Sequence, residues 1–228
     1  MDGGQTLGSA LPGRAYPPPP KPEPLWPSLL TVVASIALQV LLPDRLTAGP
    51  AWLLPVLEGG LLAALWALSP RHLAGIHRMR RRLALLVTAI VSAANAISLA
   101  LLTHELLHHE VVSGQRLIVS GVLIWLTNVL IFSLWYWETD RGGPGRRAAG
   151  EDGQPDFLFP QMNDDRIQPA GWRPEFIDYL YLSLTNAMAL SPTDTMPLTG
   201  AAKSMMGLQS LISLVTLALI VSRAVNIL

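Results

Sequence analysis

Oxygen-bearing side chains suited to a small cation lie together in one short loop. The hydroxyls of Ser191, Thr193 and Thr195 flank the carboxylate of Asp194, and they follow the short apolar segment 176–189. If that segment is a helix, its last carbonyl groups add partial negative charge at the same place. The pattern predicts a weak cation site or constriction. A capped turn, in which Thr193 or Asp194 accepts hydrogen bonds from backbone N–H groups, is the alternative.

Ionisable and amide side chains also occur inside long apolar runs. Glu58 is the one acidic residue well inside a predicted membrane span. Such a group costs at least ~2.5–3.5 kcal/mol to insert, so it marks either a transport pathway or a buried pair. Asn95, Thr127 or Asn128 are the candidate partners from neighbouring helices. The two asparagines are most simply explained as hydrogen-bonding links between helices.

A zinc-type motif, His104-Glu105-x-x-His108, follows the apolar segment 83–102, which is the third predicted span. Two histidines four residues apart share one helix face, and the glutamate polarises water in proteases with this signature. No third ligand is obvious, and the connection to the next apolar run is short. We therefore interpret the motif as a polar cap, and we predict neither a metal site nor catalytic residues.

Composition places the chain in a membrane. Half of its 228 residues are hydrophobic and 14% are charged, and the apolar residues form uninterrupted blocks. The lipid bilayer is therefore the first expected partner. The formal net charge is zero, which indicates no attraction to nucleic acid. The absence of cysteine excludes disulfides and cysteine nucleophiles, and nothing in the sequence indicates a cofactor.

The predicted elements form four regions. They are a disordered proline-rich tail (1–25), a four-helix transmembrane region (26–137, with spans 26–42, 52–68, 83–102 and 117–137), a polar linker read as a loop (138–173) and a hairpin (174–228). In the hairpin, the segment 176–189 is about 21 Å long as a helix, too short for the ~30 Å hydrocarbon core, whereas 201–227 can cross it.

The hairpin resembles the pore helix, filter and inner helix of bacterial potassium-type ion channels. Their pattern is D-x-L-Y-F-S-x-T-T-x-T-T-V-G-Y-G-D-x-x-P, and this chain reads Asp178-Tyr-Leu-Tyr-Leu-Ser-Leu-Thr-Asn-Ala-Met-Ala-Leu-Ser-Pro-Thr-Asp-Thr-Met-Pro197. Thr185 and Asp194 fall on the pattern. The resemblance implies a pore module that works as a tetramer. More loosely, the whole chain resembles uncharacterised bacterial multi-pass membrane proteins, which implies no particular activity.

The resemblance fails at the ion filter itself. The glycine-tyrosine-glycine triplet is Ser191-Pro192-Thr193 here. Stacked filter carbonyls need backbone angles that favour glycine, and proline fixes its own φ. The sequence therefore supports the architecture and argues against potassium selectivity.

Basic residues predict the orientation. If 174–190 does not cross the membrane, most Lys and Arg residues share the face of the tail, the 71–82 loop and the 138–173 linker. That face is cytoplasmic by the positive-inside rule, so the pore loop would enter from the cytoplasm. Alternatively, 174–190 crosses completely and gives six spans, or the loop keeps the orientation found in channels and the charge rule fails.

These features predict an all-α protein of the bacterial inner membrane. It is a polytopic transmembrane helical bundle with five spans plus a re-entrant pore-loop half-helix, or six spans. The expected function is an oligomeric cation channel that does not select potassium. A non-conducting scaffold that binds lipid or a partner protein is the alternative, and an intramembrane zinc protease is a third and weaker one.

Overall fold

A computed structural model describes residues 24, 26–47, 52, 55–60, 63, 74–108, 114–148, 153–163, 172–191 and 194–225. Residues 55–60 are helical. The other elements are α1 (Trp26–Val40), η1 (Asp44–Leu46), α3 (Ala74–His108), α4 (Gly114–Thr139), η2 (Asp140–Gly142), α5 (Pro144–Ala148), β1 (Phe157–Leu158), η3 (Pro160–Met162), α6 (Phe176–Ala189), β2 (Met196–Pro197) and α7 (Gly200–Val225).

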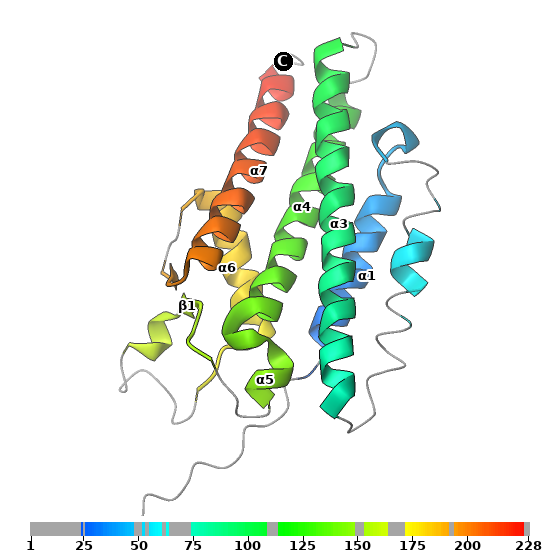
Figure 1. The fold of residues 1–228 in the computed structure, drawn as a ribbon. Helices are drawn as coiled ribbons and strands as arrows, with labels where there is room; N and C mark the ends of the chain where they lie inside the picture. Colours follow the sequence, from blue (N-terminus) through cyan, green and yellow to red (C-terminus); the bar gives the residue numbers. More distant parts are fainter. Residues whose placement is uncertain are drawn as a thin grey trace, which may run out of the picture.

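The long helix α4 is the centre of the molecule. It packs against α1, α3, α6 and α7, and it is the most deeply buried of the three long helices (Figure 1). Its approach to α7 depends on Gly121, because a Cβ at that position would lie 2.6 Å from Cγ1 of Ile220. Small residues at such contacts let membrane helices come close together.

Three helices are long and apolar enough to cross a membrane. They comprise residues Met79–His108, Gly114–Gly142 and Gly200–Val225, and they correspond to the predicted third, fourth and last spans. Together they indicate a helical membrane protein. The predicted first span is the shorter helix α1, which has 15 residues. The predicted second span and the proline-rich tail lie largely outside the described residues.

The polar linker is more ordered than the loop that its sequence predicts. The backbone of Arg141, Gly142 and Gly143 is left-handed, with φ of 53°, 82° and 93°, so η2 turns the chain directly into α5. A Cβ on Gly143 would meet the carbonyl oxygen of Glu138 at 2.8 Å, so this position requires glycine. The prediction of a loop was wrong for these residues, because elements of two to five residues leave no periodicity in the sequence.

The linker also holds the chain segment that follows α6. Strand β1 pairs with β2 in antiparallel register, with Phe157 opposite Pro197 and Leu158 opposite Met196. Just beyond the pair, the Leu198 N–H donates to the Asp156 carbonyl at 2.8 Å. The chain after α6 is therefore brought back to the linker that follows α4.

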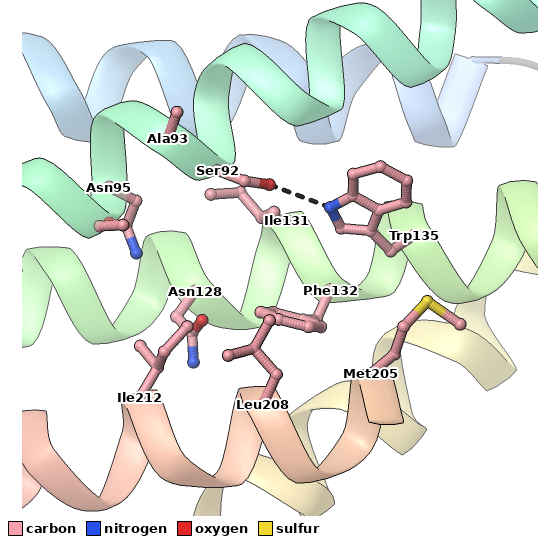
Figure 2. A pocket seen from close by; sticks show the side chains of 11 residues that line it. Ser92, Ala93, Asn95, Asn128, Ile131, Phe132, Trp135, Met205, Leu208 and Ile212 are labelled. Atoms are coloured by element: carbon pink, nitrogen blue, oxygen red, sulfur yellow. Dashed lines mark hydrogen bonds between the residues drawn. The ribbon is translucent and has the colours of Figure 1, made fainter. Parts of the chain in front are cut away.

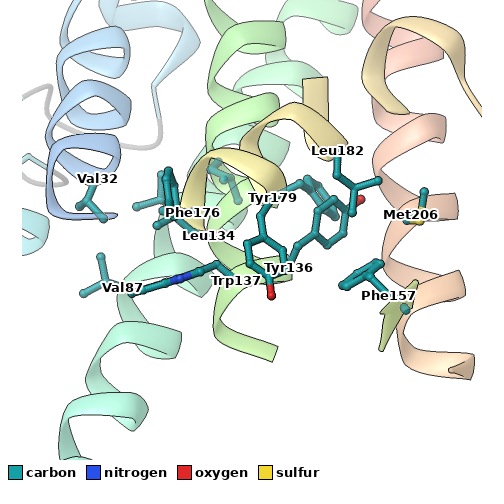
Figure 3. Close-up of a cluster of buried hydrophobic side chains, with 14 of the residues drawn as sticks. Val32, Val87, Leu134, Tyr136, Trp137, Phe157, Phe176, Tyr179, Leu182 and Met206 are labelled. Carbon is teal, nitrogen blue, oxygen red and sulfur yellow. The ribbon is translucent and has the colours of Figure 1, made fainter. Parts of the chain in front are cut away.

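A cluster of buried aromatic side chains fixes this end of the bundle (Figure 3). The ring of Phe157 packs edge-on against Tyr136 at 5.0 Å between centroids, and Phe176 packs in the same way against Trp137 at 5.7 Å. Such pairs contribute about 0.5–1.5 kcal/mol each beyond the burial of their surface. Linker, α4 and α6 thus share one core.

Helix α6 has the bounds that the sequence predicts. Its 14 residues span about 21 Å, whereas the 26 residues of α7 span about 39 Å. Both helices begin at the end of the bundle where α5 and β1 lie; α6 stops part-way along α7, and α7 continues to the opposite end (Figure 1).

Candidate functional site

The turn after α6 exposes part of the predicted cation site. Leu190 takes a left-handed conformation (φ 54°), and its N–H donates to the Asn186 carbonyl, which ends the helix. Ser191 and Asp194 are exposed, and Thr193 lies outside the described residues. Two of the five predicted ligands are therefore exposed at this turn.

Two other predicted ligands do not join them. The Thr185 hydroxyl donates to the carbonyls of Tyr181 and Leu182 in its own helix, at 2.9 and 3.1 Å. The side chain of Thr195 is buried, at 2% exposure. In the described residues, any cation site at this turn consists of Ser191, Asp194 and the terminal carbonyls of α6.

A buried hydrogen-bond network joins α6 to α7 and α4, and Gln209 on α7 is its centre. The Gln209 amide oxygen accepts from the Tyr136 hydroxyl at 2.5 Å and from the Asn186 amide at 2.8 Å. Its amide nitrogen donates to the carbonyl and the hydroxyl of Ser183, at 2.9 and 2.7 Å. The side chain is completely buried. One residue thus binds three side chains on two other helices.

The network continues along both partner helices. The Ser183 hydroxyl donates to the Val129 carbonyl on α4 at 2.6 Å, and the Asn186 amide also donates to the Met206 carbonyl on α7 at 3.1 Å. The Asn128 amide donates to the Ser213 hydroxyl at 3.0 Å. These bonds satisfy polar groups that lipid could not, so they fix the position of α6 against the two long helices.

Sequence analysis missed this network, although a signal for it exists. Gln209, Ser213 and Thr216 are spaced four and three residues apart, which places them on one face of α7. All three are completely buried. A polar stripe inside an apolar helix predicts a buried contact with other polar side chains, and residues Ser183 and Asn186 on α6 show the same spacing.

A second polar cluster holds the start of α6 and the start of α7 to the linker. The buried carboxylate of Asp140 accepts from the Tyr179 hydroxyl of α6 at 2.6 Å and from the Asp156 N–H at 2.8 Å. The Thr199 hydroxyl, just before α7, donates to the Asp156 carboxylate at 2.6 Å. The start of α6 and the start of α7 are thereby tied to the same linker residues.

A buried arginine strengthens the same cluster. Arg147 is 2% exposed, and its guanidinium donates to the carbonyls of Trp137 and Asp140 at 2.9 and 2.7 Å. It also lies over the rings of Trp137 and Tyr179, at 5.9 and 5.6 Å from their centroids. At the α6 start, the Asp178 carboxylate accepts from the Glu175 N–H at 2.7 Å, and burial raises the pKa of Asp178.

No known protein family matches the chain, and neither a curated protein nor a solved structure is significantly similar to it. The interpretation of this site therefore depends on its residues and geometry.

The intramembrane polar residues predicted from sequence fall into two kinds. Asn128 belongs to the network described above. Glu58 and Asn95 are 0% and 3% exposed, and neither carboxylate oxygen of Glu58 nor the amide oxygen of Asn95 has a hydrogen-bond partner among the described residues. The predicted Glu58 partners are not used. Gln39 of α1 lies close enough to the Glu58 carboxyl to interact with it, but the two side chains do not have hydrogen-bond geometry.

The zinc-type motif lies in the last turns of α3. The rings of His104 and His108 stack at 4.3 Å, and His108 Nδ1 lies 3.0 Å from the His104 carbonyl oxygen. The Glu105 carboxylate forms an ion pair with Arg45 at 3.9 Å. The described part of the chain contains no group of three or more His, Asp or Glu side chains that could hold a metal ion.

Proposed function

We propose that the chain is a multi-pass protein of the bacterial inner membrane in which α6 is a re-entrant half-helix. Three observations support this. Helix α6 is shorter than the hydrocarbon core, the β1–β2 pair returns the chain to the linker, and α7 then runs the length of the bundle. The pairing favours five spans over six, because a complete crossing would separate β2 from β1 by the thickness of the membrane.

The hairpin then enters from the cytoplasmic side. The start of α3 carries Arg80, Arg81 and Arg82, and Arg81 lies beside Gly143 at the junction of α4 and α5. Arg146 and Arg147 follow in α5. This basic end is the end from which α6 starts, and basic residues favour the cytoplasmic face.

For function, we propose that an oligomer of the chain conducts monovalent cations along the tip of the hairpin. The observation that carries this proposal is the exposure of Ser191 and Asp194 directly beyond the carbonyl end of α6. Helix C-termini that point into a membrane carry partial negative charge and coordinate cations in other folds. One chain supplies only one wall of a path, so conduction requires a homo-oligomer, and the channel resemblance implies four copies.

A non-conducting scaffold is the second candidate. It is favoured by the inward position of Thr195, the internal bonds of Thr185 and the network that holds α6 within its own chain. In that case the hairpin serves packing, and the basic end holds anionic lipid or a partner protein.

Cation flux separates the two candidates. The purified full-length chain is placed in liposomes, and uptake of potassium, sodium and rubidium is measured for the wild type, for Asp194→Asn and for Asp44→Asn. Asp44 is an exposed carboxylate in η1, so it is a matched control away from the hairpin. Conduction predicts flux that falls at least severalfold in Asp194→Asn and is unchanged in Asp44→Asn. Absence of flux for all three ions removes the channel proposal and leaves the scaffold.

A further inference from the structure

The arginines at the end of the bundle where α3 begins fall into two sets. Arg141 and Arg147 bond to other groups of the protein. Arg81, Arg82 and Arg146 form neither an ion pair nor a hydrogen bond with any described residue. The carboxylates at the end of α4 are buried and do not pair with them. Three positive charges therefore remain without a partner in the described part of the chain.

Two of these arginines approach the same turn from different elements. A Cβ on Gly143 would lie 3.4 Å from Nε of Arg81, and a Cβ on Gly142 would lie 2.7 Å from Cδ of Arg146. Arg81 is half-buried: its Nε is enclosed, and its two terminal nitrogens bond to no described residue. Arg82, the next residue of α3, is exposed. The turn from α4 into α5 thus has cationic side chains beside it from both α3 and α5.

The level of these arginines along the bundle is that of lipid phosphates. The two candidate spans that meet here, Met79–His108 and Gly114–Gly142, have 30 and 29 residues, so they are about 45 and 44 Å long. These lengths match the ~40–45 Å of a bilayer with its headgroups, and exceed the ~30 Å of the hydrocarbon core. The helices pack side by side, and the Trp135 indole N–H donates to the Ser92 hydroxyl at 2.9 Å (Figure 2). The start of α3 and the end of α4 therefore lie in one headgroup layer.

An apolar path for an acyl chain begins beside the arginines. Arg82, Leu86, Ala89 and Ala93 are all exposed and are spaced four, three and four residues apart, so they share one face of α3. Ala93 also lines a groove of about 450 Å³ between α3 and α7 on the surface of α4 (Figure 2). From Arg82 to Ala93 the helix rises about 16 Å, close to half of the ~30 Å hydrocarbon core, which is the depth of one leaflet. A lipid with its headgroup at Arg82 can lie along this face over its full length.

We propose that Arg81, Arg82 and Arg146 bind the phosphate group of an anionic phospholipid. Guanidinium groups donate paired, charge-assisted hydrogen bonds to phosphate oxygens, and basic side chains at this level attract anionic lipid. An acidic protein segment suits the site less well, because it would have to enter a layer that lipid phosphates already occupy. The proposal specifies the lipid that the scaffold candidate invokes. It rests on the orientation proposed above only for the leaflet, which is the cytoplasmic one, and it holds whether or not the chain conducts.

The first test compares two lipids that differ in net charge. Full-length protein in detergent micelles is titrated with dioleoyl phosphatidylglycerol or with dioleoyl phosphatidylcholine, and bound lipid is counted by native mass spectrometry. The two lipids have the same acyl chains and the same phosphate, but the choline group cancels the negative charge. We expect phosphatidylglycerol to bind at least roughly fivefold more tightly, the contribution of one basic side chain near a membrane surface. Equal affinity of the two lipids would overturn the proposal.

Three variants locate the binding. Arg81→Gln and Arg82→Gln together should weaken phosphatidylglycerol binding roughly twenty- to thirtyfold and leave phosphatidylcholine binding unchanged. Arg146→Gln should weaken it roughly fivefold, and because Arg146 is exposed on α5, this variant tests the site independently of how well the double variant folds. Arg116→Gln is the matched control, since Arg116 is exposed at the start of α4, the opposite end of that helix, and it should change neither lipid. Unchanged phosphatidylglycerol binding in the folded double variant or in Arg146→Gln contradicts the site. So does an equal loss in Arg116→Gln.

Two competitors separate the lipid from other anions. Glycerol phosphate carries the phosphate without acyl chains, and a poly-glutamate peptide represents an acidic protein partner. Neither, added in excess, should displace phosphatidylglycerol. Displacement by glycerol phosphate would mean a site for a soluble phosphate, and displacement by the peptide would mean a protein-binding surface, so either result overturns the proposal. Binding in micelles depends neither on ion flux nor on membrane orientation, so its failure is distinct from failure of the channel or of the re-entrant hairpin.

Discussion

Polar side chains are buried on both sides of α4, and the two sides treat them differently. Between α4, α6 and α7, Gln209 and its neighbours satisfy one another. On the side of α1 and α3, the side chains of Gln39, Glu58 and Asn95 keep unpaired atoms among the described residues. A buried polar group without a partner is costly in a membrane. We infer that the polar bonds of the first side hold the helices together, and that these three side chains of the second side contribute less to stability within the described residues.

The largest expected effect is on the satisfied side. Gln209→Leu keeps the side-chain volume but leaves the Tyr136 hydroxyl, the Asn186 amide and the Ser183 carbonyl short of partners. We expect the free energy of unfolding to fall by roughly 2–4 kcal/mol, because each orphaned group costs ~1–3 kcal/mol in water-soluble proteins and less in membranes. Thermal and SDS-induced unfolding of the purified protein measure it. Ser210→Ala is the control, since Ser210 makes only a 3.3 Å bond at the edge of the network. Equal losses in both variants would contradict a central role for Gln209.

Loss of the hydrogen bond between Tyr179 and Asp140 should cause the next largest loss of stability. Tyr179→Phe removes the hydroxyl that donates to the Asp140 carboxylate, and hydrogen bonds to charged groups contribute about 1.5–3 kcal/mol. We expect a loss of stability of that size in the same unfolding assays. Tyr181→Phe, on the exposed face of α6, is the matched control and should be neutral. Stability that does not differ between the two variants would mean that the Asp140 contact does not hold α6.

Removal of a polar group on the side of α1 and α3 should raise the free energy of unfolding instead of lowering it. Glu58→Leu removes a carboxyl with no described hydrogen-bond partner, and it should raise the free energy of unfolding by roughly 1–3 kcal/mol, since the acid costs ~2.5–3.5 kcal/mol to insert. Glu58→Gln, which keeps the shape without the charge, should fall between the wild type and Glu58→Leu. Destabilisation by Glu58→Leu would show that a partner outside the described residues satisfies the carboxyl.

The smallest effect compares two asparagines beside one groove. Asn128→Leu loses the bond to Ser213 and should cost about 0.6 kcal/mol, the average for interhelical bonds in a membrane. Asn95→Leu has no such bond to its amide oxygen to lose and should be neutral or slightly stabilising. Equal destabilisation of the two variants in SDS titration would contradict the inferred difference between the two sides of α4.

Sequence reasoning predicted the elements that local pattern determines. The bounds of α6 follow from its apolar block between Pro174 and the proline-containing loop, and α3, α4 and α7 contain the predicted spans because apolar runs of that length are unambiguous. Sequence reasoning could not predict the β1–β2 pair. Phe157 and Pro197 are forty residues apart, and two-residue strands leave no periodicity to detect.

The cation site stays a prediction, and the structure describes only how exposed some of its residues are. A loop rich in hydroxyls indicated Ser191 and Asp194, whose exposure depends on local chemistry. The inward turn of Thr195 depends on packing that no local pattern reveals. Gln209 was missed because its partners come from two other helices, although the polar stripe on α7 marks its position.

The central claim is that α6 enters the membrane and returns to the side from which it came. The chain has no cysteine, so single cysteines can be placed at Glu175 and Gly200, at the starts of α6 and α7. Arg146 in α5 and Asp44 in η1 mark the opposite ends of the bundle, because Gly143 before α5 lies near Arg81 in the first half of α3, whereas Arg45 pairs with Glu105 at the end of α3. Labelling with a membrane-impermeant maleimide in right-side-out and inverted vesicles shows on which side of the membrane each cysteine lies. The account predicts that Glu175→Cys and Gly200→Cys are both labelled from the side of Arg146→Cys. Labelling of Gly200→Cys from the side of Asp44→Cys would mean that α6 crosses the membrane, and would contradict the account.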